Sequence, residues 1–249
     1  MEIGVQVSSL KPLLTTAVQV ESAFRKIRQL GCRTVQLQWI DPAVSVEEIA
    51  GVMERTDLRS VGVQDFFQAV QTNFSYYADL NAATGGRWVT VSRIPPEYQS
   101  ESGLAQFVEL LRKMQQRLDG YGQKLNFHPV LSDYRAIPER DAVAMLMEAM
   151  PELELCADLY HLGRWQADMP GYLRRWPGRI PMVHFKDSKL GRLVPAGQGE
   201  TNWTGVVKCC LELGIAYGFA EQETWDQDPY DCLGQAMAWI KDEEKRCKE

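Results

Sequence analysis

The side chains that could hold a metal ion or move a proton gather in the second half of the chain. The sequence holds only three histidines, His128, His161 and His184, and each lies at or just past the end of a segment expected to form a β-strand. Asp158 and Glu221 also end such segments. Two imidazoles and two carboxylates suit Mn²⁺, Fe²⁺, Co²⁺, Ni²⁺ or Zn²⁺ better than Mg²⁺, which prefers oxygen ligands.

Short segments of β-strand character alternate along the chain with longer segments of helical period. The expected strands are 3–7, 34–38, 60–64, 87–92, 124–128, 153–158, 181–185 and 217–222. The expected helices are 18–30, 45–55, 70–83, 101–118, 139–150, 169–176, 203–213 and 230–245. This alternation predicts parallel strands joined by right-handed crossovers. Eight such units in 249 residues predict an α/β fold, a (β/α)₈ TIM barrel that forms a single domain over residues 1–249.

A parallel barrel would bring the candidate ligands together, because the carboxyl ends of its strands open onto one face. His128, Asp158, His184 and Glu221 end four successive expected strands. Taken singly, each histidine is more readily explained as a hydrogen-bonded structural residue. Taken together, the four side chains predict a shared metal site at the mouth of the barrel.

Composition and motifs exclude several other classes of protein. The net charge of -6 disfavours a nucleic-acid partner. No G-x-G-x-x-G follows the first expected strand, and the glycine-rich run at 197–199 lacks the Lys-Ser/Thr of a phosphate loop. Six cysteines without a C-x-x-C pair indicate a reducing compartment. With no signal peptide or membrane-spanning stretch apparent, we expect a cytoplasmic protein with no membrane partner.

Several segments resemble the xylose isomerase-like TIM barrel superfamily. That superfamily includes sugar phosphate isomerases and epimerases, inosose dehydratases and hydroxypyruvate isomerases, with AP endonuclease family 2 enzymes as distant relatives. The weakest similarity is the opening Ile-Gly-Val-Gln-Val-Ser-Ser-Leu. The others are Asn126-Phe127-His128-Pro129, Cys156-Ala157-Asp158-Leu159-Tyr160-His161, the Gly-Arg-Ile-x-x-x-His-x-Lys-Asp pattern at 178–187, the Gly-x-Gly pattern before Asn202-Trp203, and Glu221-Gln222-Glu223.

The resemblance implies one divalent metal ion held by His128, Asp158, His184 and Glu221. His128 departs from the family pattern, because many of the epimerases have at this position a Glu that also transfers a proton. A second departure is Gln36, where the family often has Glu. Both departures make the expected site less acidic than in those relatives.

The expected chemistry follows from a metal ion that binds a substrate carbonyl and the neighbouring hydroxyl. Such an ion acidifies the adjacent C–H and stabilises an enediolate. Glu221 or Glu223 is then the candidate base, and His161 could polarise or protonate a substrate oxygen. Lys186 could neutralise the enediolate or hold an anionic group. The alternative for Lys186 is a structural ion pair with Asp187 at the rim of the barrel.

Other side chains near the expected mouth could bind the substrate. Arg192 is a weaker candidate for a substrate carboxylate or phosphate. Trp39, Phe66 and Trp225 follow expected strands and could stack on the C–H faces of a sugar. For any one of these aromatic residues, ordinary loop or core packing is the competing interpretation.

The leading hypothesis is a metal-dependent isomerase or epimerase of a small sugar, a sugar phosphate or a polyol-derived ketose. One alternative is a lyase of the inosose dehydratase type, with His161 as general acid. Another is a degenerate barrel that binds a ligand without turnover, which the His128 departure keeps open. A DNA-repair nuclease would need more metal ligands and a basic surface. Many relatives form dimers or tetramers, so a homo-oligomer is compatible with the resemblance.

Overall fold

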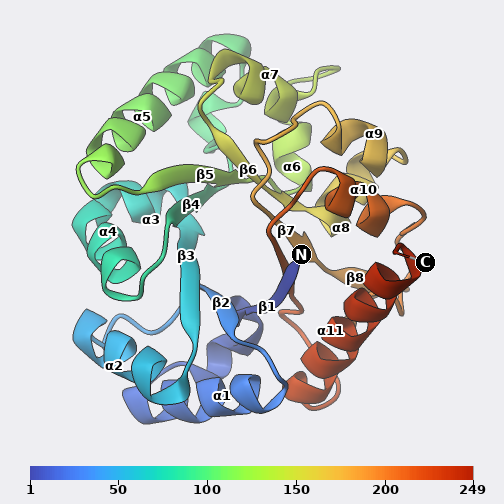
Figure 1. The fold of residues 1–249 in the computed structure, drawn as a ribbon. Coiled ribbons are helices and arrows are strands. Elements are labelled where there is room, and N and C mark those ends of the chain that lie inside the picture. Colours follow the sequence, from blue (N-terminus) through green and yellow to red (C-terminus); the bar gives the residue numbers. More distant parts are fainter. Residues whose placement is uncertain (249) are drawn as a thin grey trace.

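Eight parallel strands form a closed barrel with helices around its outside (Figure 1). The computed structural model describes residues 1–248. The barrel strands follow the order β1-β10-β7-β6-β5-β4-β3-β2. The predicted (β/α)₈ architecture is confirmed. The strands are β1 (Glu2–Gln6), β2 (Thr34–Leu37), β3 (Arg59–Phe66), β4 (Trp88–Ser92), β5 (Lys124–His128), β6 (Glu154–Asp158), β7 (Met182–Phe185) and β10 (Tyr217–Ala220).

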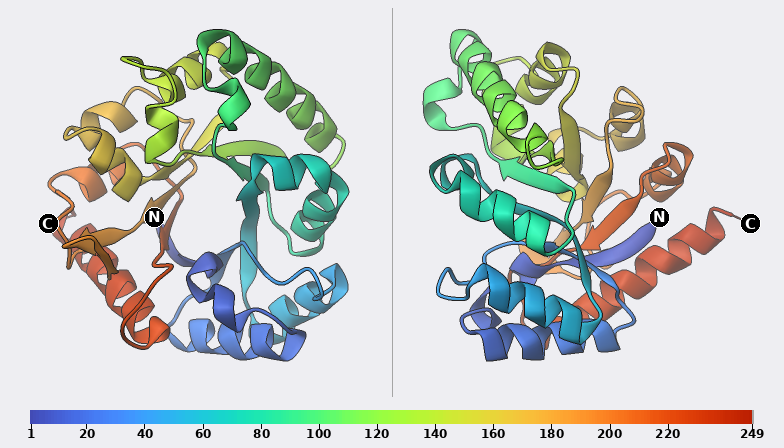
Figure 2. Two further views of the ribbon diagram at one scale, coloured as in Figure 1. Left: turned by 180° about the vertical axis from the view of Figure 1, so that it is seen from behind. Right: turned by 60° about the vertical axis from the view of Figure 1, so that its left-hand side comes forward.

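The barrel closes between its first and last strands. Backbone pairing runs from Glu2 opposite Tyr217 to Val5 opposite Ala220. The amino group of Met1 also lies 3.2 Å from Glu244 on the last helix. The right-hand view of Figure 2 shows this long helix running along the side of the barrel, with its C-terminal end near the N-terminus of the chain. Closure therefore places the end of β1 beside the end of β10, which bears on the candidate site.

The crossovers hold more elements than the sequence pattern predicts. The helices are α1 (Ala17–Gln29), α2 (Val46–Thr56), α3 (Phe67–Thr72), α4 (Phe74–Ala83), α5 (Glu101–Asp119), α6 (Leu131–Tyr134), α7 (Ala142–Ala149), α8 (Leu159–Trp165), α9 (Met169–Leu173), α10 (Val206–Glu212) and α11 (Pro229–Arg246). Two 3₁₀ helices, η1 (Val7–Leu13) and η2 (Pro96–Tyr98), and an antiparallel hairpin of β8 (Asp187–Lys189) and β9 (Arg192–Val194) complete the fold.

Several expected helix boundaries are wrong, and local hydrogen bonds explain why. The expected helix at 70–83 is two helices, α3 and α4, that meet at Asn73. The expected helix at 139–150 begins only at Ala142, because the Asp141 side chain accepts a hydrogen bond from Ala144 N. The short helix α8, missed in the sequence, is capped by Asp158. Elements of one or two turns are too short for the hydrophobic period to reveal.

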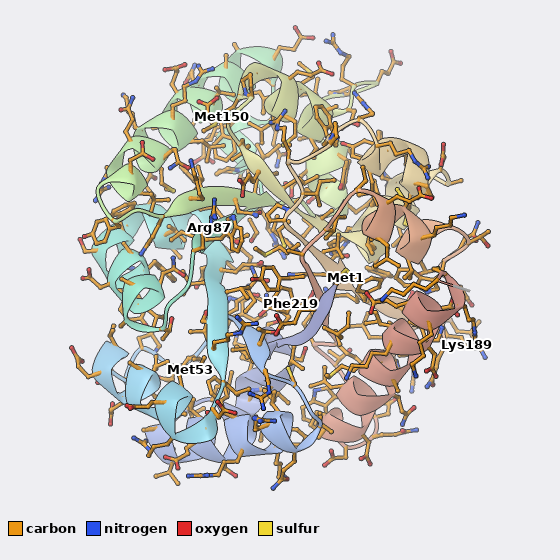
Figure 3. The ribbon with its side chains drawn as sticks, in the orientation of Figure 1. Met1, Met53, Arg87, Met150, Lys189 and Phe219 are labelled. Carbon is orange, nitrogen blue, oxygen red and sulfur yellow. The ribbon has the colours of Figure 1, made fainter. Side chains whose placement is uncertain are left out.

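Two layers of apolar side chains hold the barrel together. Outside the strands, α5 buries Leu104, Phe107 and Leu111, and the Phe107 ring meets Phe67 with centroids 4.9 Å apart. Inside the barrel, Phe219 is fully buried (Figure 3). Its ring centroid lies 6.0 Å from that of His184. An apolar floor therefore lies next to the ionisable residues of the mouth.

No helix within residues 1–248 is both long enough and apolar enough to cross a membrane.

A substitution at Gly62 tests how closely β3 and β4 approach each other. A Cβ at this position would collide with the backbone carbonyl oxygen of Trp88 on the neighbouring strand, which cannot rotate away. We expect Gly62→Ala to lower the free energy of unfolding by about 1–3 kcal/mol in urea titrations. The matched control is Gly120→Ala at the end of α5, where φ is -63° and the nearest atom would be 3.4 Å away. Equal stability of the two variants would contradict this account of strand packing.

Candidate active site at the barrel mouth

The structure brings together the four side chains that the sequence singled out as ligands. One nitrogen or oxygen from each of His128, Asp158, His184 and Glu221 lies within 4.8 Å of the others, and all four residues are buried. We call these four residues the mouth cluster. His128 and Asp158 are the last residues of β5 and β6, His184 lies within β7, and Glu221 directly follows β10. The four side chains are close enough together to hold one metal ion, while the role of each residue as a ligand stays a prediction.

His184 lies at the centre of the mouth cluster. Its Nδ1 is 3.0 Å from Glu221 Oε2 and 3.1 Å from His128 Nε2. Its Nε2 is 2.6 Å from Gln36 Oε1. Burial lowers the pKa of His184 despite the neighbouring Glu221, which favours the neutral ring with a single N–H. A neutral ring has only one N–H, so it cannot donate to the oxygen atoms of both Gln36 and Glu221. The other ring nitrogen points its lone pair at an acceptor oxygen.

Asp158 is oriented by the helix that follows it. Its Oδ1 accepts a hydrogen bond from His161 N at the start of α8. Its Oδ2 has no hydrogen-bond donor within residues 1–248, although the residue is fully buried. That oxygen lies 3.6 Å from His128 Nε2 and 3.5 Å from Lys186 Nζ. A buried carboxylate oxygen without a donor is expensive unless a cation faces it.

Lys186 supplies a buried positive charge beside the mouth cluster. Its Nζ lies 2.8 Å from Glu223 Oε1 and 3.2 Å from Glu221 Oε2, in addition to its contact with Asp158. The interpretation of Lys186 as an ion-pair partner of Asp187 is therefore wrong. Three carboxylates face this one ammonium group, which leaves an excess of buried negative charge.

Burial and neighbouring charges act in opposite directions on these groups. Burial lowers the pKa of Lys186, but Glu221, Asp158 and Glu223 outweigh it and raise that pKa above its usual value. Burial raises the pKa of Asp158, but His161 and Lys186 hold it well below its usual range. Burial lowers the pKa of His161 itself. Lys186, whose pKa is raised, is the cation that stays charged beside Asp158 through the neutral range.

The donor set fits a divalent transition-metal ion. The Oδ2 atom of Asp158 lacks a hydrogen bond, and His184 presents a nitrogen to Glu221 across 3.0 Å. A divalent cation held by this cluster would bind to the oxygen and nitrogen lone pairs that no hydrogen bond uses, and it would offset the excess negative charge. Such an ion would be held by His128, Asp158, His184 and Glu221.

His161 and Glu223 line the accessible side of the mouth cluster. The His161 side chain is 22% exposed, with Nε2 3.9 Å from Asp158 Oδ2. The Glu223 side chain is 31% exposed, whereas that of Glu221 is 3% exposed. His161 and Glu223 are therefore accessible to a substrate from the solvent side. Glu221 is buried and accessible only to a group that enters the mouth cluster.

The other candidate substrate-binding residues lie around the rim. Trp39 Nε1 donates to Asp65, and the Trp39 ring lies 5.9 Å from that of Phe66. Trp225 Nε1 donates to Ser9 O, which ties the loop after β10 to η1. Arg192 lies on β9, is paired with Asp226 and has a side chain that is 78% exposed. The structure does not bring Arg192 to the mouth cluster, and the substrate-binding roles of all four stay predictions.

Trp39 is also held in an unusual backbone conformation. Its φ of 56° lies in the left-handed region, which is costly for a residue with a large side chain. Trp39 borders a cavity of about 300 Å³ between the ends of β2 and β3 and helix α4. No member of the mouth cluster lines this cavity.

Hydrogen bonds that hold the mouth cluster and its neighbour Gln222 from η1 and β2 were missed in the sequence. Ser8 Oγ donates to Glu221 Oε1, and Gln222 N donates to Ser9 Oγ. Gln36 was noted only as a departure from the family, although it contacts His184. These contacts form because the barrel closes between β1 and β10. The spacing of residues along the sequence could not predict them.

Asp187 organises the loop after the hairpin. Its carboxylate accepts hydrogen bonds from four backbone N–H groups and one indole N–H, which belong to Ser188, Gly197, Gly199, Thr201 and Trp203. The glycines are required by close approach, because a Cβ on Gly199 would collide with this carboxylate. The glycine-rich run therefore wraps a side chain of this protein.

Residues 24–243 match the family model described as xylose isomerase-like TIM barrel. The chain belongs to this family. Three solved structures share the fold. A sugar phosphate isomerase/epimerase from Parabacteroides distasonis is 15% identical, with a TM-score of 0.78 and coverage of 95% of this chain and 96% of that chain. An L-ribulose 3-epimerase is 15% identical (TM-score 0.77, coverage 99% and 95%). A probable 3-DHS dehydratase from Bacillus anthracis is 12% identical (TM-score 0.75, coverage 97% and 99%).

A shorter similarity joins part of the chain to a vitamin B12-binding protein of Salmonella choleraesuis. The two are 33% identical over 82 residues, which is 33% of this chain and 30% of that protein. The chain thus matches less than a third of the length of this curated relative.

Asp187→Asn tests whether the Asp187 carboxylate orders the loop that follows the β8–β9 hairpin. The amide would turn an NH₂ group toward backbone N–H donors, so we expect the free energy of unfolding to fall by about 2–3 kcal/mol. Limited proteolysis should then cut within 195–203. The control is Asp168→Asn, whose side chain accepts one hydrogen bond, from Gly171 N, at the exposed start of α9. It should cost at most about 1 kcal/mol. An Asp187→Asn protein as stable and as protease-resistant as the control would refute this role.

Proposed function

We propose that the protein is a metal-dependent isomerase or epimerase of a small sugar, a sugar phosphate or a polyol-derived ketose. The observation that carries the proposal is the mouth cluster, a buried set of two imidazoles and two carboxylates with an excess of negative charge. Similarity of fold to an L-ribulose 3-epimerase and to a sugar phosphate isomerase/epimerase supports the substrate class.

The chain would use its own residues to move a proton between carbon atoms of the substrate. A bound divalent cation would acidify the C–H next to a substrate carbonyl. Glu223 is the better-placed base, because its carboxylate is more exposed than that of Glu221 and lies against Lys186. Lys186 would offset the negative charge of the enediolate form of the substrate, and His161 would donate a hydrogen bond to a substrate oxygen.

A dehydratase is the second candidate function. Elimination of a hydroxyl group needs a proton donor close to the leaving oxygen, and His161 is the accessible imidazole beside Asp158. The fold similarity to a probable 3-DHS dehydratase favours testing this reaction class. Product analysis on free ketoses, ketose phosphates and a keto-inositol separates the two candidates, because only the dehydratase forms an unsaturated product and water.

Metal content and turnover together test the proposed site. We expect Asp158→Asn and His184→Ala to lose tightly bound metal and activity, because each removes a predicted ligand. His161→Gln should keep the metal and lower kcat by about 10²–10⁴-fold, the usual contribution of a general acid or base. Elemental analysis of the dialysed proteins and a ketose epimerisation assay provide the readouts. Unchanged metal content in both ligand variants would end the proposal.

Lys186→Met tests the electrostatic balance of the site without an activity assay. Removing the ammonium leaves three carboxylates facing one another, so we expect the metal-free protein to lose about 3 kcal/mol or more of stability. Added Mn²⁺ should then raise the melting temperature of the variant more than that of the wild type. Lys189→Met removes an exposed lysine from the hairpin and should change neither quantity. Equal Mn²⁺-induced shifts in Lys186→Met and the wild type would contradict the proposed balance.

A further inference from the structure

A chain of amide hydrogen bonds leads from β1 to His184. Ser8 N donates to Gln6 Oε1 at 3.4 Å, and Gln6 Nε2 donates to Gln36 Oε1 at 3.1 Å. Gln36 Nε2 donates to Thr90 Oγ1, and Gln36 Oε1 also faces His184 Nε2 at 2.6 Å. Gln6 and Gln36 are fully buried. We call Ser8 N, Gln6 and Gln36 the amide relay.

The relay has a fixed direction, because its first donor cannot be reversed. A backbone N–H can only donate, so it sets which end of the Gln6 amide is the oxygen. The NH₂ group of Gln6 must then point to Gln36, which requires the Gln36 oxygen at that place. That oxygen can only accept, so it favours a proton on His184 Nε2. Rotating either amide by 180° would place two donors or two acceptors against each other.

Glu221 favours the other tautomer of His184, with the proton on Nδ1. Its Oε2 lies 3.0 Å from His184 Nδ1 and would accept an N–H from that nitrogen. That oxygen also lies 3.2 Å from Lys186 Nζ, which weakens its pull. The thiol of Cys156, 3.2 Å from His184 Nε2, could serve as a donor if that nitrogen lost its proton. His128 Nε2, 3.1 Å from His184 Nδ1, faces the same nitrogen as Glu221 and favours a bare Nδ1 when it carries a proton. The tautomer of His184 is thus set by Gln36 on one side of the ring and by Glu221 and His128 on the other.

We propose that Gln36, fixed by Gln6, is a positioning residue that keeps the His184 proton on Nε2 and leaves the Nδ1 lone pair directed into the mouth cluster. The inference rests on the proposed metal-dependent function, because a metal ligand nitrogen must be bare. A hydrogen bond on the far side of a ligating imidazole fixes its tautomer and orientation. The Gln36 amide does so without adding a charge to the mouth.

The His184 tautomer can be measured in the metal-free protein by ¹⁵N NMR of the imidazole nitrogens. The chain has only three histidines, and His161→Gln and His128→Gln assign the signals. At about pH 8, above the usual histidine range, we expect the Nε2–H form in the wild type. Gln36→Leu should shift the ring toward Nδ1–H, because Nε2 then loses the oxygen that accepts its proton while Glu221 still faces Nδ1. Gln36→Glu should retain Nε2–H, because its carboxylate also accepts.

Two further variants separate the relay from a general effect on folding. Gln6→Leu should move the tautomer part of the way, because Gln36 loses the bond that orients it. Gln38→Leu is the matched control, since Gln38 is a buried amide two residues further along the chain that accepts from Gln64 and not from the relay. It should leave the His184 signals unchanged. Circular dichroism checks that each variant is folded.

Calorimetric titration with Mn²⁺ provides the second readout. We expect Gln36→Leu to weaken binding by about 10–100-fold, with Gln36→Glu and Gln38→Leu within a few-fold of the wild type. An Nδ1–H tautomer in the wild type, or an unchanged tautomer in both Gln36→Leu and Gln6→Leu, would overturn the relay. A wild type that binds no Mn²⁺ while the tautomers change as expected would instead refute the proposed function and leave the relay standing.

Discussion

The structure depends on holding three carboxylates, two of them buried, around one buried ammonium at the carboxyl end of a barrel. Asp158, Glu221 and Glu223 all contact Lys186, and Asp158 and Glu221 are almost entirely out of water. Buried charge of one sign is costly without a partner. The excess negative charge supports the proposed divalent-cation site, and the remaining contacts of the mouth hold the four side chains of the cluster in place.

Hydrogen bonds from several different elements hold these buried charged and polar groups in place. Asp158 is held by the first turn of α8, Glu221 by Ser8 after β1, and His184 by Gln36 on β2. The cap of α8 is local, but the Ser8 and Gln36 contacts need the closed strand order, in which β1 lies beside both β2 and β10. Stability of the fold and geometry of the site are therefore coupled through closure. Asp187 extends the same arrangement outward by ordering the loop that follows the hairpin.

Much of the architecture could be predicted from the sequence because alternating strand and helix periods are long-range regularities. The positions of His128, Asp158, His184 and Glu221 at strand ends carried the prediction that they meet, since parallel strands share one carboxyl edge. The partner of Lys186 could not be inferred in the same way. Asp187 is its neighbour in sequence, but successive residues of an extended chain point to opposite sides. The two side chains therefore face different surroundings.

The contacts of Gln6, Ser8 and Gln36 lay beyond sequence reasoning for another reason. Glutamine and serine are common polar residues, and nothing in a single sequence distinguishes a buried amide inside a barrel from an exposed one. Their importance comes from the direction of each donor and acceptor, which only coordinates reveal. The small elements α8 and the β8–β9 hairpin escaped prediction because local hydrogen bonds, and not hydrophobic periodicity, define them.

Anomalous X-ray scattering from crystals grown with Mn²⁺ tests the central claim most directly. The account predicts one strong peak among His128 Nε2, Asp158 Oδ2, His184 Nδ1 and Glu221 Oε2, with Lys186 still in contact with Glu223. A map without a peak at this place, with Lys186 bridging Asp158 and Glu221 at saturating Mn²⁺, would contradict it.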